Sequence, residues 1–279
     1  MISKQQVVIG LTLILRLSVV TLLASAAPDP ADILALETQN PPEVLTLNGE
    51  VFHVQGLDLD DRFVYVSSVD RRAQRGMLHQ FTRTGGLVAS IDLTEGRRYH
   101  TSGFALDGDT LWIATAEYRD GGTTRISQIN AATLQVISSF IVRDHIGAVA
   151  ACGDRVYGVN WDARRIYVWD RAGYERSNVP NATRVAYQDL KCVDGTLVAS
   201  GIARGGVTGA VNWLNPITLN VERSMPVARA ESGPLWTNEG MALKGNRLYF
   251  LPEDGHDGQV QVYAFDLAHT QMVAMLSGD

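Results

Sequence analysis

One short apolar segment recurs five times along the chain, at intervals of roughly 40–50 residues. Each copy is preceded by a tight-turn sequence rich in Asp, Gly and Asn, which supply the positive φ that short hairpins require. Repeats of this length, each built from short strands, are typical of a β-propeller. The five segments are Phe63–Val66, Thr110–Ile113, Arg155–Gly158, Thr196–Ala199 and Arg247–Phe250.

The repeat predicts an all-β, five-bladed propeller with four-stranded blades, and six blades are the alternative. No repeat shows sustained helical periodicity. We expect Val44–Leu47 to complete the last blade and residues 272–276 to pack outside it, because such closure removes an open edge; the reverse is the alternative. The predicted core consists of Leu57, Val64, Val66, Phe104, Leu111, Ile113, Val149, Val156, Leu190, Leu197, Met241, Leu248 and Phe250.

Three of the six histidines occupy one column of the repeat, ten residues before the aligned segment: His53, His100 and His145. Equivalent positions on inner strands converge on the axis of a propeller. Three neutral imidazoles with an open position suit zinc or another first-row divalent metal, with Glu239 as fourth ligand or general base. The alternatives are a metal-free polar pocket and purely structural histidines.

Further candidate site residues lie on the same predicted face. An acidic column at the end of the second strands, Asp70, Glu117, Asp162 and Asp254, is expected to be mostly solvated surface. Glu239 differs because it directly precedes an inner-strand glycine, and it is the predicted catalytic residue. The predicted substrate-binding residues are Gln55, Ser102, Gln188, Asn238, Trp161 and Trp236, with Tyr99 and Tyr187 as further pocket walls.

The N-terminus has the order of a secretory signal: Lys4, an apolar stretch, then Ala24-Ser25-Ala26. We therefore expect a signal peptide over 1–26, a linker over 27–42 and the propeller over 43–279. This organisation predicts a secreted, periplasmic or cell-envelope protein, which would contact a membrane only through an uncleaved signal segment.

Charge and cysteine content narrow the function further. Removing Lys4 and Arg16 from the 24 basic residues leaves 22 against 30 acidic ones, a net charge of −8 without any basic run. Nucleic-acid binding is therefore not expected, and we predict a monomer that binds a small molecule or peptide. Cys152 and Cys192 lie in neighbouring repeats and form either a disulfide or two buried thiols.

Three short motifs resemble the blade motifs of plant-type glutaminyl cyclases, which are five-bladed propellers: His53-Val54-Gln55-Gly56-Leu57, the segment 189–196, and Asn238-Glu239-Gly240-Met241-Ala242. Ser67-Ser68-Val69-Asp70 stands where that family has an acid-rich motif. More broadly, the chain resembles exported bacterial propellers of the senescence-marker and lactonase type.

The function classes that follow are three. The first is a metal-assisted hydrolase or lyase acting on a small molecule. The second is a non-catalytic ligand-binding or scaffold propeller of the cell envelope. The third, implied by the resemblance, is glutaminyl cyclase-like acyl transfer.

Overall fold

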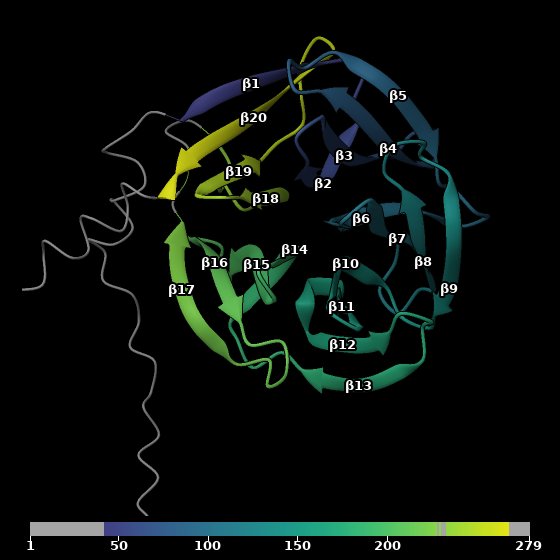
Figure 1. Cartoon of the computed structure of the whole chain (residues 1–279), viewed down its shortest axis with the longest axis vertical. Coiled ribbons are helices and arrows are strands. Elements are labelled where there is room, and N and C mark those ends of the chain that lie inside the picture. The colour runs from purple at the N-terminus through teal and green to yellow at the C-terminus, as the bar shows by residue number, and fades with distance from the viewer. Residues whose placement is uncertain (1–41, 228, 230–232, 268–279) are drawn as a thin grey trace, which may run out of the picture.

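The computed structural model describes residues 42–227, 229 and 233–267, in which antiparallel sheets are arranged in a ring around a central axis (Figure 1). This arrangement confirms the all-β propeller. Between residues 42 and 266 of the described ranges, the only helical element is one 3₁₀ turn, η1 (Trp161–Ala163). None of the described helical segments has the length and apolar character needed to cross a membrane. The expected signal peptide and nearly all of the expected linker lie outside the described residues.

The described strands form three four-stranded sheets and one eight-stranded sheet, in which the inner strands of two groups of four pair in parallel through Gly103 and Ala148. The five groups of four each run from an inner strand outward (Figure 1). The first group contains β2 (His53–Leu59), β3 (Phe63–Asp70), β4 (Arg75–Thr82) and β5 (Leu87–Asp92). The second contains β6 (Arg98–Asp107), β7 (Thr110–Glu117), β8 (Thr124–Asn130) and β9 (Val136–Val142). The third contains β10 (Ile146–Cys152), β11 (Arg155–Asn160), β12 (Arg165–Asp170) and β13 (Glu175–Pro180). The fourth contains β14 (Val185–Val193), β15 (Thr196–Ala203), β16 (Gly209–Leu214) and β17 (Val221–Val227). The fifth contains β18 (Gly240–Lys244), β19 (Arg247–Leu251), β20 (Gln259–Asp266) and β1 (Glu43–Asn48).

The N-terminal strand closes the ring. β1 pairs antiparallel with β20, from Glu43 opposite Ala264 to Asn48 opposite Gln259. The fifth group therefore takes its outer strand from the other end of the described chain, as predicted from residues 44–47. The predicted packing of residues 272–276 lies outside the described residues.

All thirteen predicted core side chains are buried, and they pack mainly between neighbouring groups of strands. The outer strands alternate less clearly because residues on both of their faces meet solvent; in β9, for example, the adjacent Val136 and Ile137 are both exposed. Burying large apolar side chains between sheets is the main stabilising contribution in such a fold.

A buried ion pair links the inner strands at the axis. The Asp189 carboxylate accepts backbone N–H bonds from Met241 (3.0 Å) and Leu57 (3.3 Å), and the Lys191 ammonium lies 2.6 Å from it. Burial raises the pKa of Asp189 to about 6, although the charge of Lys191 opposes that rise. One carboxylate thus ties the first, fourth and fifth groups together beneath the site.

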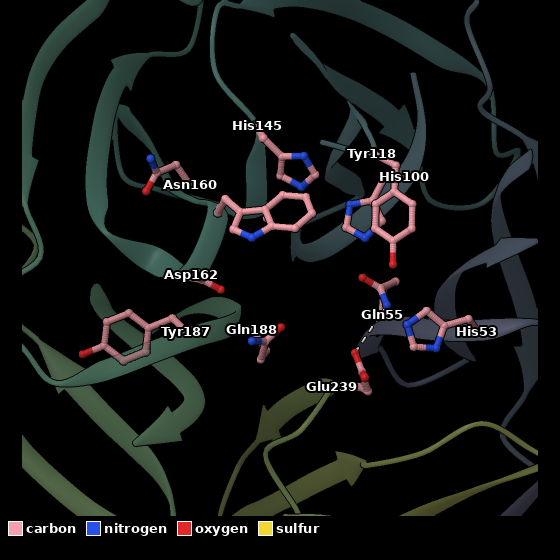
Figure 2. A pocket seen from close by; sticks show the side chains of 12 residues that line it. His53, Gln55, His100, Tyr118, His145, Asn160, Asp162, Tyr187, Gln188 and Glu239 are labelled. Atoms are coloured by element: carbon pink, nitrogen blue, oxygen red, sulfur yellow. Dashed lines mark hydrogen bonds between the residues drawn. The ribbon is translucent and has the colours of Figure 1, made fainter. Parts of the chain in front are cut away.

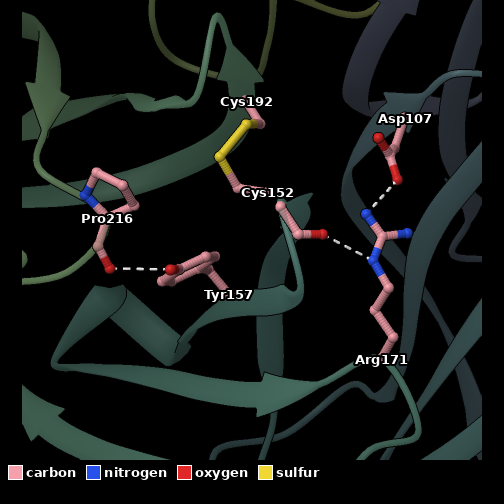
Figure 3. The surroundings of a disulfide bond; sticks show 7 residues. Asp107, Cys152, Tyr157, Arg171, Cys192 and Pro216 are labelled. Atoms are coloured by element: carbon pink, nitrogen blue, oxygen red, sulfur yellow. Dashed lines mark hydrogen bonds and ion pairs between the residues drawn. A yellow bond between two sulfur atoms is a disulfide. The ribbon is translucent and has the colours of Figure 1, made fainter.

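Cys152 of β10 and Cys192 of β14 form a disulfide with their Cα atoms 5.3 Å apart (Figure 3). The bond joins the inner strands of the third and fourth groups. A Tyr157 hydroxyl that donates to the Pro216 carbonyl (2.8 Å) makes a second link between the same groups. The sequence was compatible with either a disulfide or two buried thiols, and in the structure the two cysteines form the disulfide.

Candidate functional site

A pocket of about 210 Å³ opens on the axis at the face where the inner strands begin (Figure 2). Inner strands β2, β6, β10 and β14 all begin on this face. The second strand of each group runs antiparallel to the inner strand, so the loop after it lies on the same face. Its lining mixes aromatic rings with amides and carboxyls: His53, Gln55, His100, Tyr118, His145, Gly147, Asn160, Trp161, Asp162, Tyr187, Gln188 and Glu239.

His53 is paired with a carboxylate from the neighbouring group. Its Nδ1 lies 2.9 Å from Oδ1 of Asp254, which also accepts the backbone N–H of Val54 at 2.9 Å. Burial opposes ionisation of Asp254, but the bonds from His53 and Val54 outweigh it and lower the pKa of this carboxyl. Because a carboxylate accepts, His53 donates from Nδ1, and its neutral form keeps a lone pair on Nε2.

Glu239 is the half-buried acid of the pocket. Its Oε1 accepts a bond from the Asn238 amide (3.0 Å), and Gln55 Nε2 lies 3.4 Å from its Oε2. Burial raises the pKa of Glu239 well above its ordinary value, and the negative charge of Asp254 adds to this rise. Arg71 opposes the shift without cancelling it. The carboxyl therefore keeps its proton to a higher pH than a solvated glutamate does.

His100 and His145 belong to a wall of aromatic rings. His100 stacks on Tyr118 with centroids 4.4 Å apart, and His145 meets Trp161 edge to face at 4.5 Å. His145 Nδ1 donates to the Glu117 carbonyl oxygen at 2.7 Å. Burial lowers the pKa of both imidazoles, well below the ordinary value in the case of His100. The wall is therefore uncharged near neutral pH.

The three histidines do not form a common ligand set. His100 and His145 are adjacent, with centroids 4.9 Å apart, whereas His53 stands apart from them beside Gln55 and Glu239 (Figure 2). No group of three or more His, Cys, Asp or Glu side chains that could hold a metal ion occurs within the described ranges. The geometry brings His100 and His145 together and pairs His53 with Asp254, so a metal shared by His53, His100 and His145 stays a prediction.

The other predicted site residues divide into two sets. Gln55, Gln188 and Trp161 line the pocket, whereas Ser102 lies beneath it and donates to the Ile146 carbonyl (3.1 Å). Asn238 contacts the pocket through Glu239. Trp236 is buried between Tyr263 and Phe265, at centroid distances of 4.7 and 5.3 Å, and does not line the pocket. Its large apolar surface is used for packing between sheets instead.

The sequence did not single out Tyr118 and Asn160. It predicted Asp254 as solvated surface, and the Asp254 side chain is 52% exposed although it also pairs with His53. Tyr118 directly follows Glu117, and Asn160 precedes Asp162 by two positions, so both are close to the acidic column. Inspecting the neighbours of that column would have found them. No sequence signal pairs Asp254 with His53, because the two are 201 residues apart.

The ring of sheets and its axial pocket define a β-propeller of the kind that carries its site at one end of the axis. More particularly, the chain belongs to the family of unknown function DUF6454, which it matches over residues 33–268.

Solved structures of similar fold are only distantly related in sequence. The glutaminyl cyclase of Myxococcus xanthus is 14% identical, with 81% of this chain and 97% of that one covered at a TM-score of 0.55. A protein of unknown function from Bacteroides caccae is 11% identical, with coverages of 80% and 90% and a TM-score of 0.52. A luciferin-regenerating enzyme is 10% identical, with coverages of 80% and 95% and a TM-score of 0.50. No curated protein matches the chain. At these identities the similarity concerns the fold alone.

Proposed function

We propose that the axial pocket binds a small molecule and acts on it by general acid–base catalysis. Glu239 is the acid and the His53–Asp254 pair supplies the base. The observation that carries the proposal is that Glu239 and His53 line one open pocket, with His53 Nδ1 held 2.9 Å from Oδ1 of Asp254. The raised pKa of Glu239, caused mainly by burial, supports its role as the acid. A titratable group with a strongly perturbed pKa in a cleft is typical of catalytic sites.

The base follows from the orientation of His53. Asp254 fixes the ring by accepting from Nδ1, so Nε2 is the nitrogen available to take a proton from substrate or water. This is the base-and-orienter arrangement that nucleophilic and hydrolytic sites share. The half-buried His53 ring (18% exposed) remains accessible from the pocket.

The acid follows from the surroundings of Glu239. A protonated carboxyl donates a hydrogen bond to a substrate carbonyl oxygen, or passes a proton to a leaving group. Its neighbour Gln55 offers an amide to the same region. Together these groups suit reactions at a carbonyl or ester carbon, which agrees with a hydrolase or lyase and requires no metal-bound intermediate.

Glutaminyl cyclase-like acyl transfer is a narrower form of this proposal. In that reaction the α-amine of an N-terminal glutamine attacks its side-chain amide carbon, and ammonia leaves with an added proton. His53, Gln55 and Glu239, which belong to the motifs that carry the resemblance, line one pocket here. The similar fold of the Myxococcus xanthus glutaminyl cyclase makes this substrate worth including in the assay.

The test measures turnover of three compounds, a phenyl ester, a γ-lactone and an N-terminal glutamine dipeptide, by wild type and by Glu239→Gln and His53→Gln. We expect at least one substrate to be turned over and each variant to lose about 100-fold or more in kcat. The matched controls are Glu253→Gln and His256→Gln, since both residues are exposed on the β19–β20 loop and neither lines the axial pocket.

Equal turnover by Glu239→Gln and wild type would refute the assignment of the acid. If wild type turns over none of the three compounds, the catalytic proposal fails and a non-catalytic binding protein of the cell envelope becomes the better description. Export is also part of the proposal, and it is supported by the disulfide, since such bonds persist in oxidising compartments.

A further inference from the structure

Arg71, in the turn between β3 and β4, holds an unpaired cation over the aromatic wall. Its guanidinium carbon lies 5.8 Å from the centroid of Tyr118, whose other contacts include the stacked ring of His100. Arg71 makes no ion pair with any described residue. The adjacent Asp70 carboxylate is used within the turn, where it accepts the backbone N–H groups of Arg72 and Ala73.

Arg71 does not itself line the pocket, but it lies beside Tyr118, which does. The positive charge of Arg71 acts on Glu239 and Asp254, which belong to the fifth group of strands, and on His100 of the second group. A cation–π contact holds an arginine in place without neutralising it, because the ring carries no formal charge. An exposed guanidinium positioned in this way is suited to bidentate pairing with a carboxylate.

The remaining walls describe the rest of the ligand. The ring centroids of Trp161 and Tyr118 are 6.1 Å apart, so a ligand ring does not fit between the two side chains. The face of Trp161 that lines the pocket is therefore the surface available for stacking. The polar side of the pocket is formed by Gln55, Gln188 and Glu239. A 150 Å³ cavity holds benzene, so about 210 Å³ accommodates one ring with a few further atoms.

We infer that the ligand is a small planar carboxylate, whose ring stacks on Trp161 and whose carboxylate pairs with Arg71 beside Tyr118. This inference rests on the proposed function of the axial pocket and specifies its substrate class. The competing class is a cation attracted by Asp162. That carboxylate is less available to a ligand, because it lies within the field of Arg164.

The test compares three probes of nearly equal size and different charge, benzoate, benzamide and benzylamine, by calorimetric titration of the whole protein. We expect benzoate to bind at least about tenfold more tightly than benzamide, as one charge-assisted bidentate contact allows. Arg71→Gln should remove this tenfold preference and leave benzamide binding unchanged. The matched control is Arg72→Gln, which loses the same charge at an exposed neighbouring position.

Equal effects of Arg71→Gln and Arg72→Gln would overturn the inference, because they would show only a long-range field. Tightest binding of benzylamine, lost in Asp162→Asn, would replace the carboxylate by a cation. Failure of all three probes to bind, or unchanged affinities in Trp161→Leu, would also overturn it. Benzoate selectivity without any turnover would refute the catalytic proposal alone, whereas turnover of neutral substrates without benzoate preference would refute this inference alone.

Discussion

Removing the disulfide between Cys152 and Cys192 should destabilise the propeller strongly. The bond closes a sequence separation of 40 residues between two neighbouring groups of strands. For such a loop the chain-entropy relation gives about 4 kcal/mol at 25 °C, because the reduced unfolded chain regains that conformational freedom. With a urea m-value of about 3 kcal/mol/M, the unfolding midpoint of Cys152→Ala/Cys192→Ala should fall by about 1–1.5 M.

The assay is urea unfolding followed by tryptophan fluorescence, with and without reductant. Wild type with reductant should approach the double variant, and each single variant should lose nearly as much as the double, because either change breaks the same bond. Reductant should leave the double variant unaffected, which is the control. Two titratable thiols in protein prepared from an oxidising compartment, or a midpoint that ignores reductant, would contradict the reasoning.

Three further predictions concern particular side chains. Burial lowers the pKa of His79 to about 4, so the folded state binds fewer protons than the unfolded state below pH 6.5. The contribution of His79 to the free energy of unfolding is then fully present above pH 6.5 and falls by about 3 kcal/mol as the pH drops to 4. Urea unfolding of His79→Gln should show a smaller loss of stability between these pH values than wild type. Equal losses in the two proteins would show that His79 is not the cause. Asp254→Asn should leave His53 without its anionic partner and lower kcat at least about tenfold, with NMR reporting the change in tautomer; an unchanged spectrum and rate would remove the pair from the mechanism. Gly103→Ala places a Cβ 2.5 Å from a backbone carbonyl oxygen of β14 and should cost about 1–3 kcal/mol in urea unfolding, whereas Gly147→Ala, whose nearest contact is 3.8 Å, should be tolerated; equal stabilities would show that the axis can relax.

Part of the candidate site could be predicted from the repeat. Three histidines in one column and a glutamate before an inner-strand glycine placed His53, His100, His145 and Glu239 on one face, and all four line the pocket. Trp236 was predicted to bind substrate but packs between sheets instead, because no sequence signal distinguishes an aromatic residue that lines a pocket from one that packs beside it. Its burial against Tyr263 depends on the outer strands of the same group.

The sequence by itself determined the fold, the buried core and the closing strand. Each is encoded locally: the Asp, Gly and Asn turns set the hairpins, apolar alternation sets which faces are buried, and an orphan strand at 44–47 must pair to remove an open edge. These signals are short-range and are repeated five times, so one repeat reinforces the next.

The tertiary structure alone decided the chemistry of the axis. Whether the three histidines of one repeat column share a ligand or take separate partners depends on which loops of other groups lie beside them, and no single repeat encodes this. His53 is bound by Asp254 from a distant loop, and His100 and His145 are enclosed by Tyr118 and Trp161. Desolvation and charge act through space, so the proton kept on Glu239 is a property of the assembled ring.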